Sequence, residues 1–274
     1  MNKILIPTDF SDGAFNALLH GLHLAKTMDS SIQIVHAYSM PPTGSNVMVD
    51  ITDILKKNAE EELAELKKRV SALDLAKDIQ IDYKATYGSV VDVVNRLSHE
   101  EGVSLVVMGT QGASGITEKW LGSNTAAAAR NVERPLLAVP AELPFREIET
   151  ILFSTDMKVM KNKEPLNFVA DFAGKTKAQV KFLHIREEGE KDGDKNDDAY
   201  RQQVHETFGE SKPVFTFMYN DEVEDGIEEA IERENPSLLV VVRHEYGFFQ
   251  SIWHSSVSRH VLNEASLPIL VLNG

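Results

Sequence analysis

The 274-residue sequence contains no cysteine, which excludes disulfide bonds, thiolate nucleophiles and cysteine-ligated metal sites. Long apolar runs are also missing, because no stretch approaches the roughly 20 residues that a membrane-spanning helix needs. The first ten residues, MNKILIPTDF, lack the apolar region and the small-residue cleavage site of a secretory signal peptide. We therefore expect a cytoplasmic protein that does not contact a membrane.

Basic residues are scarce, with 28 Lys and Arg against 42 Asp and Glu, for a formal net charge of −14. A surface of that sign repels nucleic acid and anionic lipid. The longest basic run, Lys67-Lys68-Arg69, lies on a predicted helix that also carries several glutamates. This mixture of charges is typical of a solvent-exposed helix face rather than of a nucleic-acid-binding patch. The sequence therefore predicts no nucleic-acid partner.

The chain contains an internal repeat, and its length suits two domains better than one. The segment KILIPTDF returns as TILFSTDM, and SLVVMGTQG returns as SLLVVVRHE. The matched pairs include Asp9 with Asp156, His36 with His184, and Pro135 with Pro268. We predict two homologous domains, covering residues 1–142 and 148–274.

Each copy alternates short apolar runs with helical patterns. In the first copy we expect strands at 3–7, 32–37, 79–86, 105–108 and 136–139, and helices at 10–28, 51–73, 89–101 and 124–132. Ser11 is placed to cap the first helix. The alternation predicts an α/β protein with two tandem open parallel-sheet domains of Rossmann-like type. In such sheets, ligands bind beyond the carboxyl ends of the strands where the strand order reverses.

The segment after the fourth predicted strand carries the most chemical information. Gly109 and Gly112 follow a buried strand, and Gly122-Ser123 opens the next helix. Glycines allow close backbone approach, and a helix start presents unpaired N–H groups, so together they suit phosphate binding. A glycine-rich turn alone is more often structural. Its place beside Asp9, at the tip of the first strand, favours a binding site.

At these residues the chain resembles the universal stress protein family in its tandem two-domain form. The nucleotide motif of that family is Gly, two residues, Gly, nine residues, Gly, then Ser or Thr, and Gly109, Gly112, Gly122 and Ser123 fit it without a gap. The turn Pro7-Thr8-Asp9, His36 at the end of the second strand and the Met108-Gly109 junction also match. The resemblance covers essentially the whole chain.

The resemblance implies binding of an adenine nucleotide, ATP, ADP or AMP, with or without Mg²⁺. The tip of the first strand and the residue after the histidine would meet adenine, and the glycines and serine would meet ribose and phosphates. The implied contact residues are Pro7, Thr8, Asp9, Ala37, Met108, Gly109, Gly112, Gly122, Ser123 and Asn124. One departure is Ala113, where the family often has a basic residue, which leaves the phosphates to backbone N–H groups, Lys119 or a metal ion.

The second copy has lost the motif. Arg243 takes the place of Gly109, Tyr246 or Gly247 that of Gly112, and Ser255 that of Gly122. Side chains would then fill the space where backbone approaches phosphate. We expect a degenerate domain that binds no nucleotide.

Other motifs give weaker signals. Gly174-Lys175-Thr176 resembles the end of a P-loop, but Val169 stands where its first glycine belongs. His20 and His23 lie one helical turn apart without a third metal ligand, which is typical of ordinary helix-face histidines. The charged stretch 186–198 predicts a flexible surface loop.

The first functional hypothesis is an adenine-nucleotide-binding stress protein with a regulatory role. A Walker lysine, an evident general base and a Gly-x-Ser-x-Gly elbow are all missing from the sequence, so we do not expect an enzyme with proficient catalysis. A nucleotide-free dimerisation or interaction module and a slow ATPase remain open alternatives.

Each copy ends in a short apolar strand after a proline, at 136–139 and 269–272. Such an edge strand invites pairing. Single domains of the family dimerise through this last strand, so the resemblance implies that the two strands pair within the chain in a pseudo-twofold arrangement. A homodimer of the full chain is a further expectation from the family.

Overall fold

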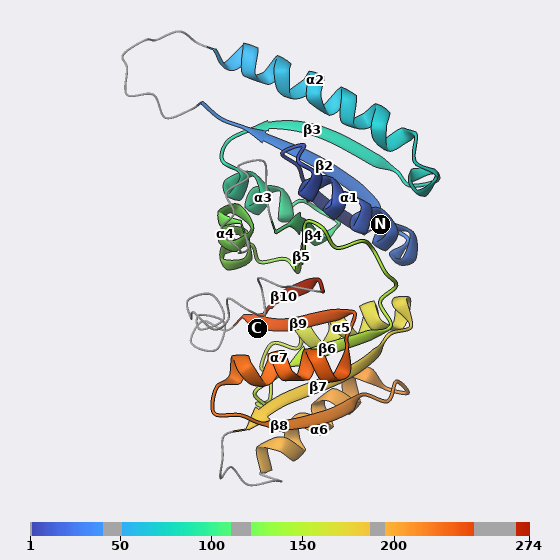
Figure 1. Ribbon diagram of the computed structural model, residues 1–274, viewed down its shortest axis with the longest axis vertical. Coiled ribbons are helices and arrows are strands. Elements are labelled where there is room, and N and C mark those ends of the chain that lie inside the picture. Colours follow the sequence, from blue (N-terminus) through green and yellow to red (C-terminus); the bar gives the residue numbers. More distant parts are fainter. Residues whose placement is uncertain (1, 41–50, 111–121, 187–194, 244–266) are drawn as a thin grey trace. The chain divides into compact units, whose positions relative to one another are not determined.

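A computed structural model gives the structure of the chain, and it describes residues 2–40, 51–110, 122–186, 195–243 and 267–274. The chain folds as two compact units, Met1–Phe145 and Arg146–Gly274. Figure 1 colours unit 1 from blue to green and unit 2 from yellow-green to red. Each unit is an α/β domain in its own right.

Unit 1 is a parallel sheet whose strands alternate with helices. Its elements are β1 (Lys3–Pro7), α1 (Asp12–Met28), β2 (Ser31–Tyr38), α2 (Thr52–Ser71), a 3-10 turn (Asp74–Ala76), β3 (Ile81–Tyr87), α3 (Val90–Ser98), β4 (Val103–Gly109), α4 (Ser123–Asn131) and β5 (Leu136–Val139). The strand order is β3-β2-β1-β4-β5, and every pair is parallel. The order therefore reverses between β1 and β4, as the predicted Rossmann-like fold requires.

Unit 2 repeats this topology. Its elements are β6 (Thr150–Ser154), α5 (Glu164–Thr176), β7 (Gln179–Arg186), α6 (Lys195–Phe208), β8 (Val214–Tyr219), α7 (Val223–Glu234), β9 (Leu238–Arg243) and β10 (Ile269–Asn273). The strand order is β8-β7-β6-β9-β10, again all parallel. The predicted fold class of two tandem open parallel-sheet domains is confirmed.

Strand β1, in the interior of the sheet of unit 1, is apolar without alternation. Ile4, Leu5 and Ile6 of β1 are all fully buried, because helices cover both faces of a parallel sheet. Helix α1 begins at Asp12, two residues later than predicted, and Ser11 caps it as predicted, since its side chain accepts a hydrogen bond from the Ala14 N–H at 3.2 Å. No helix among the described residues is both long and apolar enough to cross a membrane.

The prediction of a flexible surface loop over residues 186–198 is wrong at both ends. Arg186 is the last residue of β7 and is only 2 % exposed, and its guanidinium Nη2 lies 2.8 Å from Oδ2 of Asp197 in α6. The guanidinium also lies over the ring of Phe217, 4.1 Å from the centroid. A run of charged residues predicts exposure, but opposite charges that pair across two elements can be buried together. Residues 187–194 lie outside the described part of the chain.

The face of α1 that carries Asn16 and His20 holds the segment that follows β5. The Asn16 side-chain amide donates to the carbonyl oxygens of Pro140 and Leu143, at 2.9 and 2.8 Å. His20 Nε2 donates to the same Leu143 carbonyl at 3.0 Å, and the His20 side chain is buried. The chain thus remains bound to unit 1 beyond the last strand.

His23 extends this contact by one further turn of α1. Its ring stacks on Phe145, with centroids 3.8 Å apart, and the His20 ring meets the edge of the same phenyl group. The interpretation of His20 and His23 as ordinary helix-face histidines therefore missed their contacts. Segment 140–145, which we call the connector, is held by side chains at three successive turns of α1.

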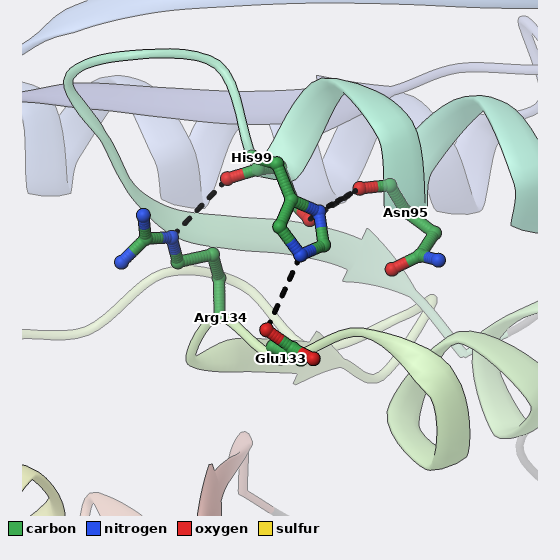
Figure 2. A network of polar contacts seen from close by, with 5 residues as sticks. Asn95, His99, Glu133 and Arg134 are labelled. Carbon is green, nitrogen blue, oxygen red and sulfur yellow. Dashed lines mark hydrogen bonds and ion pairs between the residues drawn. The ribbon is translucent and has the colours of Figure 1, made fainter.

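A second histidine contact ties α3 to the segment between α4 and β5 (Figure 2). His99 Nδ1 donates to the Asn95 carbonyl at 2.7 Å, and its Nε2 lies 3.2 Å from Oε2 of Glu133. Arg134 Nε donates to the Ser98 carbonyl at 3.2 Å. A histidine that donates from both ring nitrogens carries a positive charge, and these hydrogen bonds raise the pKa of His99.

The histidine environments predict opposite pH effects on stability. Burial lowers the pKa of His20 below its usual 6.5, so between that lowered pKa and 6.5 the folded state binds fewer protons than the unfolded state. The contribution of His20 is therefore present above pH 6.5 and is lost as the pH falls. We expect an NMR titration of the histidine Cε1 resonances to give His20 a midpoint below 6.5 and His99 a midpoint above it.

The matching stability measurement uses H20Q, which keeps a side-chain amide to donate to Leu143. Urea unfolding should show a smaller loss of stability between pH 7.5 and pH 5.5 in H20Q than in the wild type. If H20Q and the wild type lost the same amount of stability between pH 7.5 and pH 5.5, the assigned role of His20 would be contradicted.

Candidate functional site

The candidate site lies at the carboxyl ends of β2, β1 and β4, where the strand order of unit 1 reverses. Pro7 is the last residue of β1, and Ala37 and Met108 are the last but one of β2 and β4. Pro7 pairs with Val35 in register and Leu5 pairs with Val106, so the three residues lie near the carboxyl ends of neighbouring strands. The structure thus brings together the predicted residues of the first, second and fourth strands.

The turn after β1 is held by its own side chains. The Phe10 N–H donates to Thr8 Oγ1 at 3.0 Å, and both the N–H and the hydroxyl of Ser11 donate to Asp9 Oδ1, at 3.2 and 2.6 Å. Phe10 has a φ of 63°, which is uncommon for an aromatic residue. One carboxylate oxygen of Asp9 therefore fixes the turn and orients the Ser11 cap of α1.

Gly109, at the end of β4, is required by the approach of α1. A Cβ at this position would lie 2.8 Å from the Gly13 carbonyl oxygen and 3.0 Å from the Gly13 carbonyl carbon. The missing side chain of Gly109 therefore faces a helix, and contact of its backbone with ribose or phosphate stays a prediction. Gly13 was not among the predicted residues, although a glycine in the first turn of a helix lowers helix propensity and is a signal in itself.

Helix α4 begins beside the end of β4. Thr125 Oγ1 donates to the Gly109 carbonyl at 2.7 Å, and the Gly122 N–H donates to the Thr110 carbonyl. Thr125 was also missed by the sequence analysis, since its position inside the helix gave no motif. These bonds place the exposed residues Ser123 and Asn124 next to the predicted strand ends.

The two helix starts at this edge differ in how they are capped. Ser11 caps α1, whereas α4 starts after Gly122 with no side-chain cap among the described residues. Within the described residues no side chain caps the first N–H groups of α4, and such groups at a helix start attract anions. Gly112, Ala113 and Lys119 lie in 111–121, outside the described residues. Nor does any group of three or more His, Asp or Glu side chains within the described ranges form a metal site.

Unit 2 repeats the turn after its first strand. The Met157 N–H donates to Thr155 Oγ1 at 3.1 Å, and the Lys158 N–H donates to Asp156 Oδ1 at 3.1 Å. Met157 has a φ of 58°, close to that of Phe10. The Thr-Asp turn is therefore a feature of the fold in both units.

Beyond the turn, the two units diverge. Helix α5 begins at Glu164, later than the repeat would place it, and buried Met160 stands where unit 1 has Gly13. Gln203 of α6 binds this segment by accepting from the Met160 N–H at 2.9 Å and donating to the Met160 carbonyl at 2.8 Å. Arg243 stands where unit 1 has Gly109, so neither glycine of the close approach is present.

Helix α6 also covers the turn of unit 2. Tyr200 is completely buried, its burial raises the pKa of the phenol, and the nearby Asp156 carboxylate raises it further. Met157, which matches half-buried Phe10, is 2 % exposed. Side chains of unit 2 therefore occupy the space beside the turn.

The model of the universal stress protein family matches residues 1–140 and 147–273. The chain therefore belongs to the universal stress protein family, with two domains of that family in tandem.

Two relatives found by sequence each match half of the chain. Universal stress protein MJ0531 of Methanocaldococcus jannaschii is 27 % identical over 143 residues, covering 50 % of this chain and 81 % of that protein. Universal stress protein YxiE of Bacillus subtilis is 28 % identical over 145 residues, covering 50 % of this chain and 98 % of that protein. A crystal structure of a universal stress protein from Archaeoglobus fulgidus covers 99 % of this chain and 98 % of its own, with a TM-score of 0.74 and 18 % identity, and shows the same fold.

Alanine substitutions test the reason for glycine at position 109. We expect G109A to lower the free energy of unfolding by about 1–3 kcal/mol, because the new methyl group collides with the backbone of α1. The matched control is G174A in α5, where an added Cβ meets nothing within 4 Å and should stabilise by about 0.4–1 kcal/mol. Urea unfolding of both variants checks this, and a G109A chain as stable as the wild type would contradict the steric account.

Proposed function

We propose that unit 1 binds one adenine nucleotide per chain, that unit 2 binds none, and that the protein acts as a nucleotide-dependent regulator. The observation that carries this proposal is that the Asp9 turn and the start of α4, which no described side chain caps, both lie where the strand order reverses. A carboxylate can accept hydrogen bonds from an amine or from hydroxyl groups, and a free helix start favours phosphate. An adenine nucleotide carries an amine and hydroxyl groups at one end and phosphates at the other, so it could meet both features.

The adenine would lie at the strand tips formed by Pro7, Thr8, Asp9, Ala37 and Met108, with the ribose beside the glycines and Ser123. The phosphates would lie over the backbone that follows Gly109, including Gly112, and over the start of α4 at Gly122, Ser123 and Asn124. Because Ser11 already caps α1, we expect the phosphates to bind at the start of α4 rather than at the start of α1. In this proposal Mg²⁺ arrives with the nucleotide phosphates, since the described side chains offer it no site of their own.

We place this function in the cytoplasm and propose no proficient catalysis. The sequence supplies no Walker lysine and no evident base to activate water. Steady-state ATP turnover far above background would favour a slow ATPase instead. A purified chain that neither carries nor takes up nucleotide would favour an interaction module.

The unequal state of the two units supports a single nucleotide. Unit 2 keeps the Thr-Asp turn, but Met160 and Tyr200 are buried beside it, and Gln203 hydrogen-bonds to the backbone N–H and C=O of Met160. We expect calorimetric titration with ATP to give one site per chain. Two equivalent sites would contradict the proposal.

Asparagine substitutions test which turn meets the ligand. D9N keeps an oxygen to accept from Ser11 but removes the charge, so we expect ATP and adenosine to bind more weakly by on the order of tenfold. Inorganic tripolyphosphate should bind as before, because it lacks the groups that Asp9 would meet. D156N makes the same change in unit 2 and should leave all three affinities unaltered. Equal losses for ATP and tripolyphosphate in D9N would overturn the assigned role of Asp9.

We further propose that β5 and β10 pair within the chain. Each is an apolar strand at one edge of its own unit, in the orders β3-β2-β1-β4-β5 and β8-β7-β6-β9-β10. An apolar edge with unpaired N–H and C=O groups favours strand addition. The pairing would give unit 2 a structural reason to persist without a nucleotide.

Hydrogen exchange in the intact chain tests this pairing. The carbonyls of Pro135 and Pro268 point toward β4 and β9, so the alternation of a parallel strand turns the N–H groups of Leu136, Ala138 and Ile269 away from them. We expect these outward amides to exchange slowly.

The outward amides of β3, at the opposite edge of unit 1, give the reference for fast exchange. Exchange of Leu136 and Ala138 as fast as that of Tyr83 and Ala85 would contradict the pairing. Protection that grows with protein concentration would assign the edge to a homodimer instead.

A further inference from the structure

His36 contacts the turn that carries Asp9 from the neighbouring strand. Its Nδ1 lies 2.8 Å from the Thr8 carbonyl oxygen, and because a carbonyl can only accept, this nitrogen donates the hydrogen bond. The His36 ring also packs on the Phe10 ring, with centroids 4.5 Å apart. His36 thus contacts the residues on both sides of Asp9.

These contacts hold a turn that the backbone alone would not favour. Phe10 has a φ in the left-handed region, where an aromatic residue is uncommon. The Thr8 N–H donates to the Val35 carbonyl at 2.9 Å. With the bond from His36 to the Thr8 carbonyl, both backbone polar groups of Thr8 are hydrogen-bonded to β2. Asp9 lies between Thr8 and Phe10, so the orientation of its side chain depends on the backbone conformation of these two residues.

We propose that His36 is a positioning residue for the adenine side of the site. It would act through Thr8 and Phe10 and would orient the Asp9 carboxylate without contact with the ligand. This inference rests on the proposed nucleotide site of unit 1 and names a residue on which its selectivity depends.

Unit 2 supplies an internal control. His184 Nδ1 donates to the Thr155 carbonyl at 2.9 Å, the same bond to the equivalent turn. In unit 2 that turn lies beside buried Tyr200 and Met160. Loss of either histidine should loosen its own turn, but only the loss of His36 should change nucleotide binding.

The experiment compares H36L, which cannot donate, with H36N, whose amide N–H lies near the position of Nδ1. Calorimetry measures ATP, adenosine and inorganic tripolyphosphate on the full chain. H36L should lower the affinity for ATP and for adenosine by about tenfold, the effect of one positioned hydrogen bond. Its affinity for tripolyphosphate should stay within about twofold of the wild-type value. H36N should restore most of the affinity for ATP and adenosine.

H184L is the matched control, and it should lower thermal stability about as much as H36L while leaving ATP affinity unchanged. H36Q, whose amide lies further along the side chain, replaces H36L if the leucine variant does not fold, and the same losses are expected for it.

Equal weakening of adenosine and tripolyphosphate in H36L, or the same affinity loss in H184L, would overturn the positioning role. Unchanged ATP affinity in H36L, with the wild type binding ATP, would overturn this inference alone. A wild-type chain that binds neither ATP nor adenosine would overturn the proposed function itself.

Discussion

The approach of α1 to the end of β4 is the contact on which the candidate site depends. The Gly13 carbonyl lies so close to Gly109 that a single methyl group at position 109 would collide with it. This approach brings the first turn of α1, with its Ser11 cap and the Asp9 turn, beside the end of β4. On β4 itself, Thr125 holds α4 to the Gly109 carbonyl. Parallel pairing brings the ends of β2, β1 and β4 together, and the missing side chain of Gly109 lets the start of α1 lie close to the end of β4, where α4 also begins.

Unit 2 separates the parts of this arrangement that belong to the fold from those that open the site. The Thr-Asp turn, its left-handed third residue and the histidine bond to the threonine carbonyl are all present there. Met160 and Arg243 replace the two glycines, and the following helix begins later in the chain. The side chains of α6 then cover the turn. The histidine and the turn are thus present in a unit where buried side chains lie beside the turn, which is why paired substitutions in the two units can separate effects on binding from effects on folding.

The sequence allowed the fold to be predicted because the relevant signals are local and are repeated. Apolar periodicity and the internal repeat predicted the alternating strands and helices, and Ser11 predicted the start of α1. The failures all involve contacts between distant segments. A charge count cannot show that Arg186 pairs with Asp197 in the interior, and two helix-face histidines give no sign that the chain returns to them after β5. A glycine motif likewise cannot show whether the missing side chain faces a ligand or a helix, and at Gly109 it faces a helix.

Helix α1 joins the candidate site to the connector within unit 1. Its first turn packs against Gly109, its middle is buried on the sheet through Leu18 and Leu22, and Asn16, His20 and His23 hold segment 140–145. Close-packed elements move as units, because their side chains interdigitate with few voids. A displacement at the start of α1 would therefore move the whole helix and the connector that it holds. One helix thus contacts both the candidate site and the segment by which the chain leaves unit 1.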